Sequence, residues 1–122
     1  MFAIHSKVEL LKRDKQPLGS YARHYYDLFQ LSEKSEVGIM LRSSEYAAIK
    51  ADYDLISRAH FPGSYFFPEG LSFAHSDALF PPPELEGVIG QEYEAQCRLL
   101  CYGSYPSWEK VRTRFLDLRG LL

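Results

Sequence analysis

An arginine, a histidine and an aspartate lie among aromatic residues in one short segment, residues 21–31. Arg23 and Asp27 are four positions apart, so a helix places both side chains on one face. A lysine, Lys7, precedes this segment in a stretch that also favours a helix. Cationic side chains bind phosphate and carboxylate groups, and a carboxylate can accept a proton from a hydroxyl, so these residue types could do chemistry together. The plainer interpretation is a surface ion pair between Arg23 and Asp27 beside a buried aromatic stripe.

Further short motifs follow in order along the chain. Lys7 stands in HSKVELLKR, and residues 22–31 read ARHYYDLFQL. Lys50 comes next, then GLSF at residues 70–73, three prolines at 81–83, EYE at 92–94 and CYGSYPSWE at 101–109. Together these motifs resemble those of the bacterial AbiEii/AbiGii-type toxin nucleotidyltransferases, in which a lysine motif precedes the pattern R-H/D-Y-Y-D-L-Y-x-L. The resemblance spans nearly the whole chain and depends on the shared order, because each motif alone is degenerate.

The resemblance implies transfer of a nucleotide from an NTP to an acceptor such as tRNA, by a toxin that is paired with an antitoxin. It gives catalytic roles to Lys7, which would contact the triphosphate, and to Asp27, which would orient or deprotonate the acceptor hydroxyl or support a metal site. It places Arg23 and His24 in the nucleotide-binding site. Mg²⁺ and an NTP are the cofactors that it implies for the whole enzyme.

One motif of that family is missing from the sequence. No Gly-Ser leads directly into an Asp-x-Asp: Gly19-Ser20 is followed by Tyr21 and Gly63-Ser64 by Tyr65. The resemblance is therefore to the C-terminal helical part of such an enzyme, whose partner would be a separate N-terminal nucleotidyltransferase domain. An Asp-x-Asp does occur at Asp52 and Asp54, inside an expected helix, where we interpret it as a solvated pair with Tyr53 facing inward. We therefore expect weak or no NTP binding, no turnover and no bound metal or cofactor for this chain alone.

The composition is that of one ordinary globular domain. The chain has 122 residues, of which 46% are hydrophobic and 25% charged, and aromatic residues reach 15%. These values exclude a disordered or fibrous chain, and no apolar run approaches the length of a membrane span, about 18 residues. The N-terminal segment has no apolar stretch typical of a signal peptide. We expect a single domain, residues 1–122, that is soluble and cytoplasmic.

Charge is unevenly distributed although the net value is only −2. Residues 59–97 contain several acidic residues but no Lys or Arg, whereas the chain from Arg98 onward is mainly basic. The two segments either pack on each other or face partners. The alternative function is therefore a non-enzymatic immunity or antitoxin-like module whose acidic 59–97 segment masks a basic partner. Arg112, Arg114 and Arg119 pair with Glu109 and Asp117, or else bind RNA phosphates.

Cysteine and histidine give little support for a metal site. Cys97 and Cys101 supply two ligands where structural zinc needs four, so buried free thiols are the better interpretation. The other histidines, His5, His60 and His75, have no ligand spacing and suit surface or loop positions.

Caps and hydrophobic spacing predict a mainly α bundle of four to five helices. Ser6 with Glu9 resembles a capping box, Ser20, Ser44 and Ser107 suit N-caps, and Pro83 suits the first turn of a helix. The third helix would bury a stripe of Tyr46, Ile49, Tyr53 and Ile56. Residues 61–83 form a long loop rich in proline and aromatic residues, with a possible short β element at 71–73. The apolar runs at 2–4 and 37–41 fit either helix or strand.

Two tertiary arrangements follow from these elements. Lys7 and Asp27 should lie on adjacent helices and share one concave face, because a Pro-Gly turn at residues 17–19 joins the helices. The last two helices should form an antiparallel hairpin with Trp108 and Phe115 buried, since residues 108, 111, 115, 118 and 122 follow a helical stripe.

Overall fold

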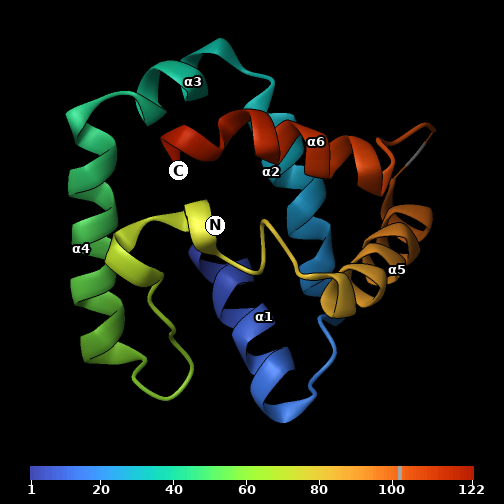
Figure 1. Ribbon diagram of the computed structural model, residues 1–122, viewed down its shortest axis with the longest axis horizontal. Helices are drawn as coiled ribbons and strands as arrows, with labels where there is room; N and C mark the ends of the chain where they lie inside the picture. Colours follow the sequence, from blue (N-terminus) through green and yellow to red (C-terminus); the bar gives the residue numbers. More distant parts are fainter. Residues whose placement is uncertain (102) are drawn as a thin grey trace.

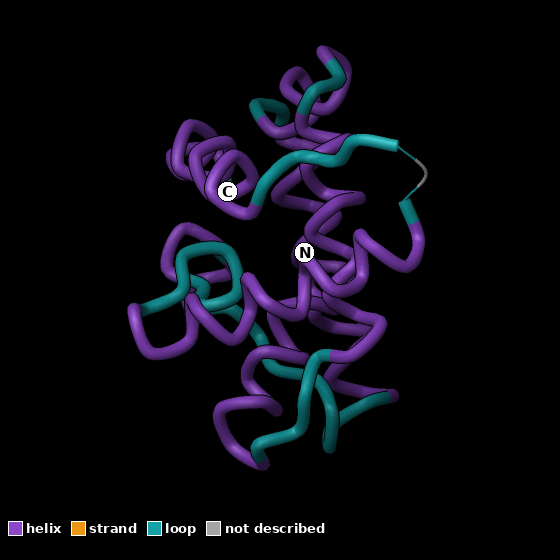
Figure 2. Tube along the Cα trace, turned by 90° about the vertical axis from the view of Figure 1, so that its right-hand side faces the viewer, coloured by secondary structure: helices purple, strands orange, loops and turns teal. Residues whose placement is uncertain are grey.

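The chain is mainly α, as predicted. The computed structural model describes residues 1–101 and 103–122. Figure 2 shows these residues as helix and loop, without a strand among them. The α-helices are α1 (Phe2–Asp14), α2 (His24–Ser32), α3 (Ser35–Leu41), α4 (Ser44–His60), α5 (Pro83–Leu100) and α6 (Trp108–Leu118). Short 3₁₀ helices are η1 (Gly19–Arg23), η2 (Glu69–Leu71), η3 (Phe73–His75) and η4 (Arg119–Leu121). The described α-helices are more numerous than expected because the apolar run at 37–41 forms most of α3.

The possible β element at residues 71–73 is a wrong prediction. These residues lie in and between η2 and η3. The Ser72 hydroxyl caps η3 by accepting from the Ala74 N–H, and the Phe73 N–H donates to the Leu122 carbonyl at 3.1 Å. The backbone groups of Phe73 and Ala74 are thus satisfied by a turn and by the distant Leu122 rather than by a strand ladder.

The first helix begins earlier than the Ser6 capping box predicted. α1 starts at Phe2, so Ser6 lies inside it and its hydroxyl contacts the Phe66 backbone instead, accepting from its N–H at 3.0 Å. Glu9 pairs with Lys12. The helix ends at Lys15, whose backbone is left-handed with φ 58° and whose N–H reaches Leu11.

The starts of α5 and α6 agree with the sequence signals. Pro83 occupies the first turn of α5, where its missing N–H costs no hydrogen bond, and Glu84 and Glu86 lie in that same turn. The Ser107 hydroxyl caps α6 by accepting from the Lys110 N–H at 3.2 Å. Both predictions hold because a helix terminus is fixed by local hydrogen bonding.

The centre of the molecule is an aromatic cluster between α2, α5 and α6. The Tyr25 ring meets Trp108 edge-on at 5.0 Å and lies 6.3 Å from Phe115. Phe115 is buried as predicted, whereas Trp108 is half-buried. Figure 1 shows α6 crossing α2, and Trp108 links it to α5 through Tyr93 at 5.7 Å. The last helix thus packs on α2 as well as on its sequence neighbour.

The helix α4 stands at one edge of the fold, with residues 61–75 between it and α1 (Figure 1). Its expected stripe is only partly buried: Tyr46 is enclosed, but Ile49 and Ile56 are 50% and 48% exposed. The stripe prediction fails there because too little of the chain packs against this helix. None of the described helices is long and apolar enough to cross a membrane.

Candidate functional site

A cavity of about 280 Å³ lies between α1, α4 and the segment that follows α4. Its walls combine one lysine with tyrosines and serines, chiefly Lys7, Tyr21, Tyr53, Ser57, Ser64 and Tyr65. α1 directs Lys7 into this space because Ile4, Val8 and Leu11 form the opposite, buried face of the helix. The predicted site residue Lys7 therefore lines a cavity.

The Lys7 ammonium lies over an aromatic ring. Its Nζ is 4.2 Å from the centroid of Tyr21, within the range of a cation–π contact. Among the described residues, no carboxylate lies within ion-pair distance of Lys7. The charge is held in place by a ring and remains available to an anion.

The aromatic walls of the cavity come from α4 and the loop after it. Tyr53 stacks on Phe2 with centroids 4.3 Å apart, so it does face inward, although the side chain is 45% exposed. Tyr65 donates from its hydroxyl to Asp54 at 2.7 Å. Burial tends to raise the pKa of Asp54, but bonds from Tyr65 and Arg58 outweigh it, and that pKa is lowered. Asp54 is thus paired, and the solvated-pair prediction holds for Asp52 alone.

The sequence reasoning missed Tyr53 and Tyr65 as parts of this site. The available signal was the run of aromatic residues at 53, 61 and 65, each of which lines the cavity with Lys7. Phe73, by contrast, is fully buried and packs edge-on against Phe2, so it attaches this part of the chain to α1.

The other predicted residues surround a different cavity. Asp27 and Arg23 line a space of about 280 Å³ together with Cys97 and Cys101. The partner of Asp27 is His24, with Nδ1 and Oδ2 3.6 Å apart, rather than Arg23. Lys7 and Asp27 therefore do not line one cavity. Both cysteines are free thiols, as expected, and burial raises the pKa of Cys97 to about 11.

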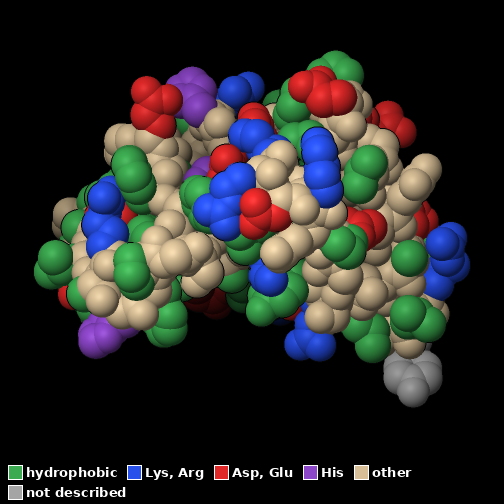
Figure 3. Space-filling model, turned by 90° about the horizontal axis from the view of Figure 1, so that it is seen from below, with side chains coloured by type: hydrophobic (Ala, Val, Ile, Leu, Met, Phe, Trp, Pro, Cys, Tyr) green, Lys and Arg blue, Asp and Glu red, His purple; other side chains and the backbone are tan. Residues whose placement is uncertain are grey.

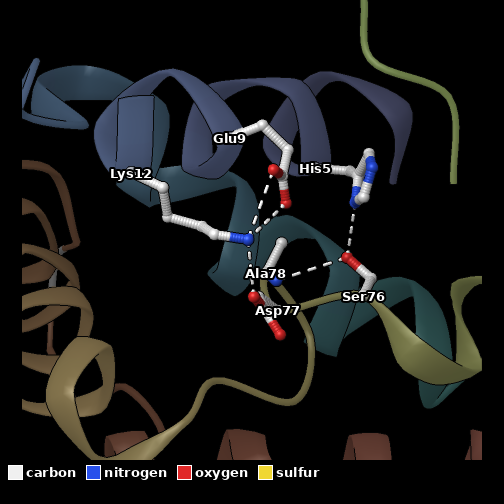
Figure 4. Close-up of polar contacts among 6 residues, drawn as sticks. All are labelled: His5, Glu9, Lys12, Ser76, Asp77 and Ala78. Carbon is white, nitrogen blue, oxygen red and sulfur yellow. Dashed lines mark hydrogen bonds and ion pairs between the residues drawn. The ribbon is translucent and has the colours of Figure 1, made fainter. Parts of the chain in front are cut away.

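A buried polar cluster connects α1 to the segment before α5, as Figure 4 shows. His5 Nδ1 lies 2.7 Å from the Ser76 hydroxyl, and that hydroxyl accepts from the Ala78 N–H. Two turns further along α1, Lys12 pairs with Glu9 at 3.1 Å and with Asp77 at 2.7 Å. A serine beside a histidine and a carboxylate resembles a hydrolase triad in composition alone.

Burial decides the role of His5 and Ser76. Both are buried, and neither lines any of the cavities described here, so a substrate has no access to the serine. Burial lowers the pKa of His5, and the nearby Glu9 and Asp77 carboxylates oppose this only in part. The pair holds residues 76–78 against α1. The expectation of a surface or loop position was wrong for His5, because its helix faces the core there.

The arginines of the basic C-terminal segment mostly make contacts with other parts of the same chain. Arg112 pairs with Glu86 at 2.7 Å and Arg114 with Glu33 at 3.0 Å. Arg119 donates to the Ala74 carbonyl at 2.7 Å. The prediction that these arginines pair with Glu109 and Asp117 is wrong. Spacing along α6 would allow such pairs, but the arginines instead bind acceptors from other parts of the chain. The Arg112–Glu86 pair joins the acidic and basic segments, as mutual packing requires.

Figure 3 shows the lower face of the molecule, where Lys and Arg side chains alternate with Asp and Glu. This face is no single-sign field of the kind that draws nucleic acid. Among residues 1–101 and 103–122, no cluster of three or more His, Cys, Asp or Glu side chains could hold a metal ion. The Lys7 cavity has no carboxylate in its lining, so its residues do not fit Mg²⁺.

Comparison with protein-family models, with curated proteins and with solved structures finds no significant match to this chain.

Proposed function

We propose that this chain is a nucleotide-binding helical domain, the C-terminal portion of a nucleotidyltransferase toxin, and that the Lys7 cavity receives the nucleotide. The observation that carries the proposal is the half-buried Lys7 ammonium, held over Tyr21 in a cavity whose lining has aromatic rings and no carboxylate. A nucleotide has the two complementary parts. Its phosphates take a cation, and its base stacks on tyrosine rings.

The arrangement of the cavity supports a ligand with an anionic end and a flat end. Tyr21 and Tyr53 are 40% and 45% exposed, so each offers ring surface to a ligand. The Ser64 hydroxyl in the lining supplies a further hydrogen-bonding group. An anion at Lys7 would keep the cation–π contact and add a charge-assisted hydrogen bond. These residues bind and orient the nucleotide, and they perform no proton transfer.

Asp27 enters the proposal in a different place. It lines the second cavity with Arg23 and pairs with His24, so it would face an acceptor or the missing domain rather than the triphosphate in the Lys7 cavity. Catalysis by the whole enzyme then needs the metal carboxylates of that domain, whose chemistry is to stabilise charge on the transferring phosphate. The present chain supplies binding and orientation.

Titration with nucleotide, followed by NMR of the aromatic resonances, tests the proposal. ATP, CTP, GTP and UTP at millimolar concentration should shift the Tyr21 and Tyr53 resonances, because the expected affinity of this portion alone is weak. Inorganic triphosphate should perturb the Lys7 side chain without the ring-current shifts that a stacked base adds. Shifts that are absent from both tyrosines under all four nucleotides would rule out the cavity as a nucleotide site.

A pair of lysine variants isolates the phosphate contact. Lys7→Gln should weaken nucleotide binding at least tenfold, the effect of losing one charge-assisted hydrogen bond of about 1.5 kcal/mol. Lys110→Gln is the matched control, because Lys110 also lies over an aromatic ring, Phe29 at 5.8 Å, but on α6 and outside the cavity. Equal losses in the two variants would mean that nucleotide binds through general charge.

Turnover is tested separately from binding. Incubation of this chain with Mg²⁺, labelled NTPs and total tRNA should give no incorporation, since the metal-binding carboxylates are missing. Incorporation that Asp27→Ala abolishes would show instead that the chain is catalytically complete.

The alternative function, an acidic mask for a basic partner, gains no support from the contacts. In the 59–97 segment, Asp77 pairs with Lys12 and Glu86 with Arg112. Glu92 accepts from the Leu18 N–H at 3.1 Å, so it holds the start of η1 against α5. Carboxylates committed to internal contacts are poor candidates for electrostatic recognition.

A further inference from the structure

A second type of cavity lies between α2, α3 and α6. It measures about 270 Å³, and nearly all of its lining is aliphatic or aromatic, including Leu28, Val37, Met40, Phe115, Leu118 and Leu122. Ser32 provides the polar side chain of the lining, and its hydroxyl is already bonded to the Phe29 carbonyl and to Arg114. Such a space holds water poorly and accepts apolar groups.

A polar cavity of about 440 Å³ adjoins this apolar one. The two share Ser32, Val37, Leu41 and Leu118 in their linings, so they are neighbours. The polar cavity contains three cationic side chains, Lys34, Arg42 and Arg114, against two carboxylates, Glu33 and Asp117. One of those carboxylates, Glu33, is paired with Arg114.

The remaining cations are available to a ligand. Among the described residues, Lys34 makes no side-chain hydrogen bond or ion pair, and Arg42 uses only Nη1, to the Gly38 carbonyl at 3.0 Å. Both residues flank α3, whose half-buried Val37 and Met40 face the apolar cavity. An apolar cavity thus lies next to a space lined by two cationic side chains that are available to a ligand.

We propose that these neighbouring cavities bind a free medium-chain alkyl carboxylate. The alkyl chain occupies the apolar cavity against Leu28, Val37 and Leu118, and the carboxylate lies between Lys34 and Arg42. A ligand with an alkyl tail and a single anionic head matches both parts, whereas a polar anion leaves the apolar walls uncovered. The site is separate from the Lys7 cavity in residues and in position.

Chain length gives the first test. Calorimetric titration of the protein with hexanoate, octanoate and decanoate, each below its micelle concentration, should show tighter binding by about fourfold for each added methylene, the effect of burying one CH₂. Acetate should not bind. Affinity that does not change with chain length would exclude the apolar cavity as the tail site.

The head group is tested with a charge-removing pair of substitutions. Lys34→Gln with Arg42→Gln should weaken decanoate binding at least tenfold, or about 1.4 kcal/mol, and leave decanol binding unchanged. The control is Lys15→Gln with Arg98→Gln, which removes two exposed charges outside both cavities. Decanol binding as tight as decanoate, or an equal loss in the control, would overturn the carboxylate assignment.

A filling variant and a membrane arm complete the test. Val37→Phe narrows both cavities at a half-buried position and should abolish decanoate binding while the circular dichroism spectrum and nucleotide titration stay unchanged. Methyl resonances of Leu118 should shift with decanoate in the wild type only. Binding to anionic phosphatidylglycerol vesicles without binding of free decanoate would contradict the proposal, because the ligand would then be a lipid surface.

Discussion

The two sides of this molecule use helices of similar length in different ways. α5 has 18 residues and buries Ile89, Tyr93 and Cys97. At Gly90 it lies so close to Trp108 of α6 that the tryptophan ring leaves no room for a Cβ on residue 90. α4, at 17 residues, buries only Tyr46 and Ser57. α5 thus forms part of the hydrophobic core, whereas α4 lies at the edge of the fold and lines the Lys7 cavity with one face.

The difference shows that hydrophobic spacing alone does not decide burial. The stripe on α4 has the same 3-4-3 spacing as the buried stripe on α6, yet Ile49 and Ile56 are about half exposed while Val111 and Phe115 are enclosed. What differs is the neighbour: α6 lies across α2, whereas α4 contacts a loop and the start of α1 (Figure 1). Mutations should therefore have strong effects on one side and weak effects on the other.

The largest effect is expected for the buried ring of α6. Phe115→Ala should lower the free energy of unfolding by about 3–5 kcal/mol, because Phe115 is 3% exposed and contacts Tyr25. Leu116→Ala is the adjacent control, with a side chain that is 51% exposed, and should change stability by about 0.5 kcal/mol or less. Urea unfolding measures both. Equal small shifts would mean that α6 is not part of the core.

A pair of glycines in α5 gives the next prediction. A Cβ on Gly90 would lie 2.8 Å from Cδ1 of Trp108, so Gly90→Ala forces the ring to move and should destabilise by about 1–3 kcal/mol. A Cβ on Gly87 meets nothing within 4 Å, so Gly87→Ala should stabilise by up to about 1 kcal/mol through helix propensity. Thermal melts of the two variants should move in opposite directions, and stabilisation by both would contradict the close contact of α5 with Trp108.

The buried His5 predicts a pH dependence. Burial lowers its pKa below the ordinary value of about 6.5, so in that range the unfolded chain binds the proton more readily than the folded one. The neutral, buried His5 side chain therefore contributes fully to the free energy of unfolding above about pH 6.5. This contribution is lost as the pH falls from there toward the lowered pKa of His5.

Urea unfolding at a series of pH values between 7.5 and 5.5 measures this effect. His5→Gln should flatten the dependence, and His60→Gln, at an exposed position, should leave it as in the wild type. An unchanged slope in the His5 variant would assign the pH dependence to other groups.

The smallest effect is expected for the exposed apolar side chains of α4. Leu55→Gln and Ile56→Gln should each change the free energy of unfolding by about 0.5 kcal/mol or less, because these side chains are 71% and 48% exposed. Tyr46→Ala, at the buried end of the same helix, should cost several times more. A large loss in the Ile56 variant would show that the stripe is buried in solution, as its spacing predicts.

The local signals in the sequence predicted the mainly α class and the starts of α5 and α6, but they misplaced the starts of α1 and α2, where Ser6 and Ser20 were expected as caps. Pro83 and Ser107 mark the starts of α5 and α6 because helix termini are satisfied by residues within one turn. Lys7 was selected through the motif resemblance, and the structure places it in the lining of a cavity. The free thiols of Cys97 and Cys101 followed from their spacing in the same way.

Only the tertiary structure decided which side chains meet. It placed Lys7 over Tyr21 and opposite Tyr53, but Asp27 in another cavity with Arg23, because η1 turns the chain before α2 begins. It buried His5 against Ser76, a residue 71 positions away. No periodicity encodes such contacts, since burial depends on which distant segment covers a helix face. Local sequence signals determined the helical class and the starts of α5 and α6, and packing determined which helix faces became core, cavity or surface.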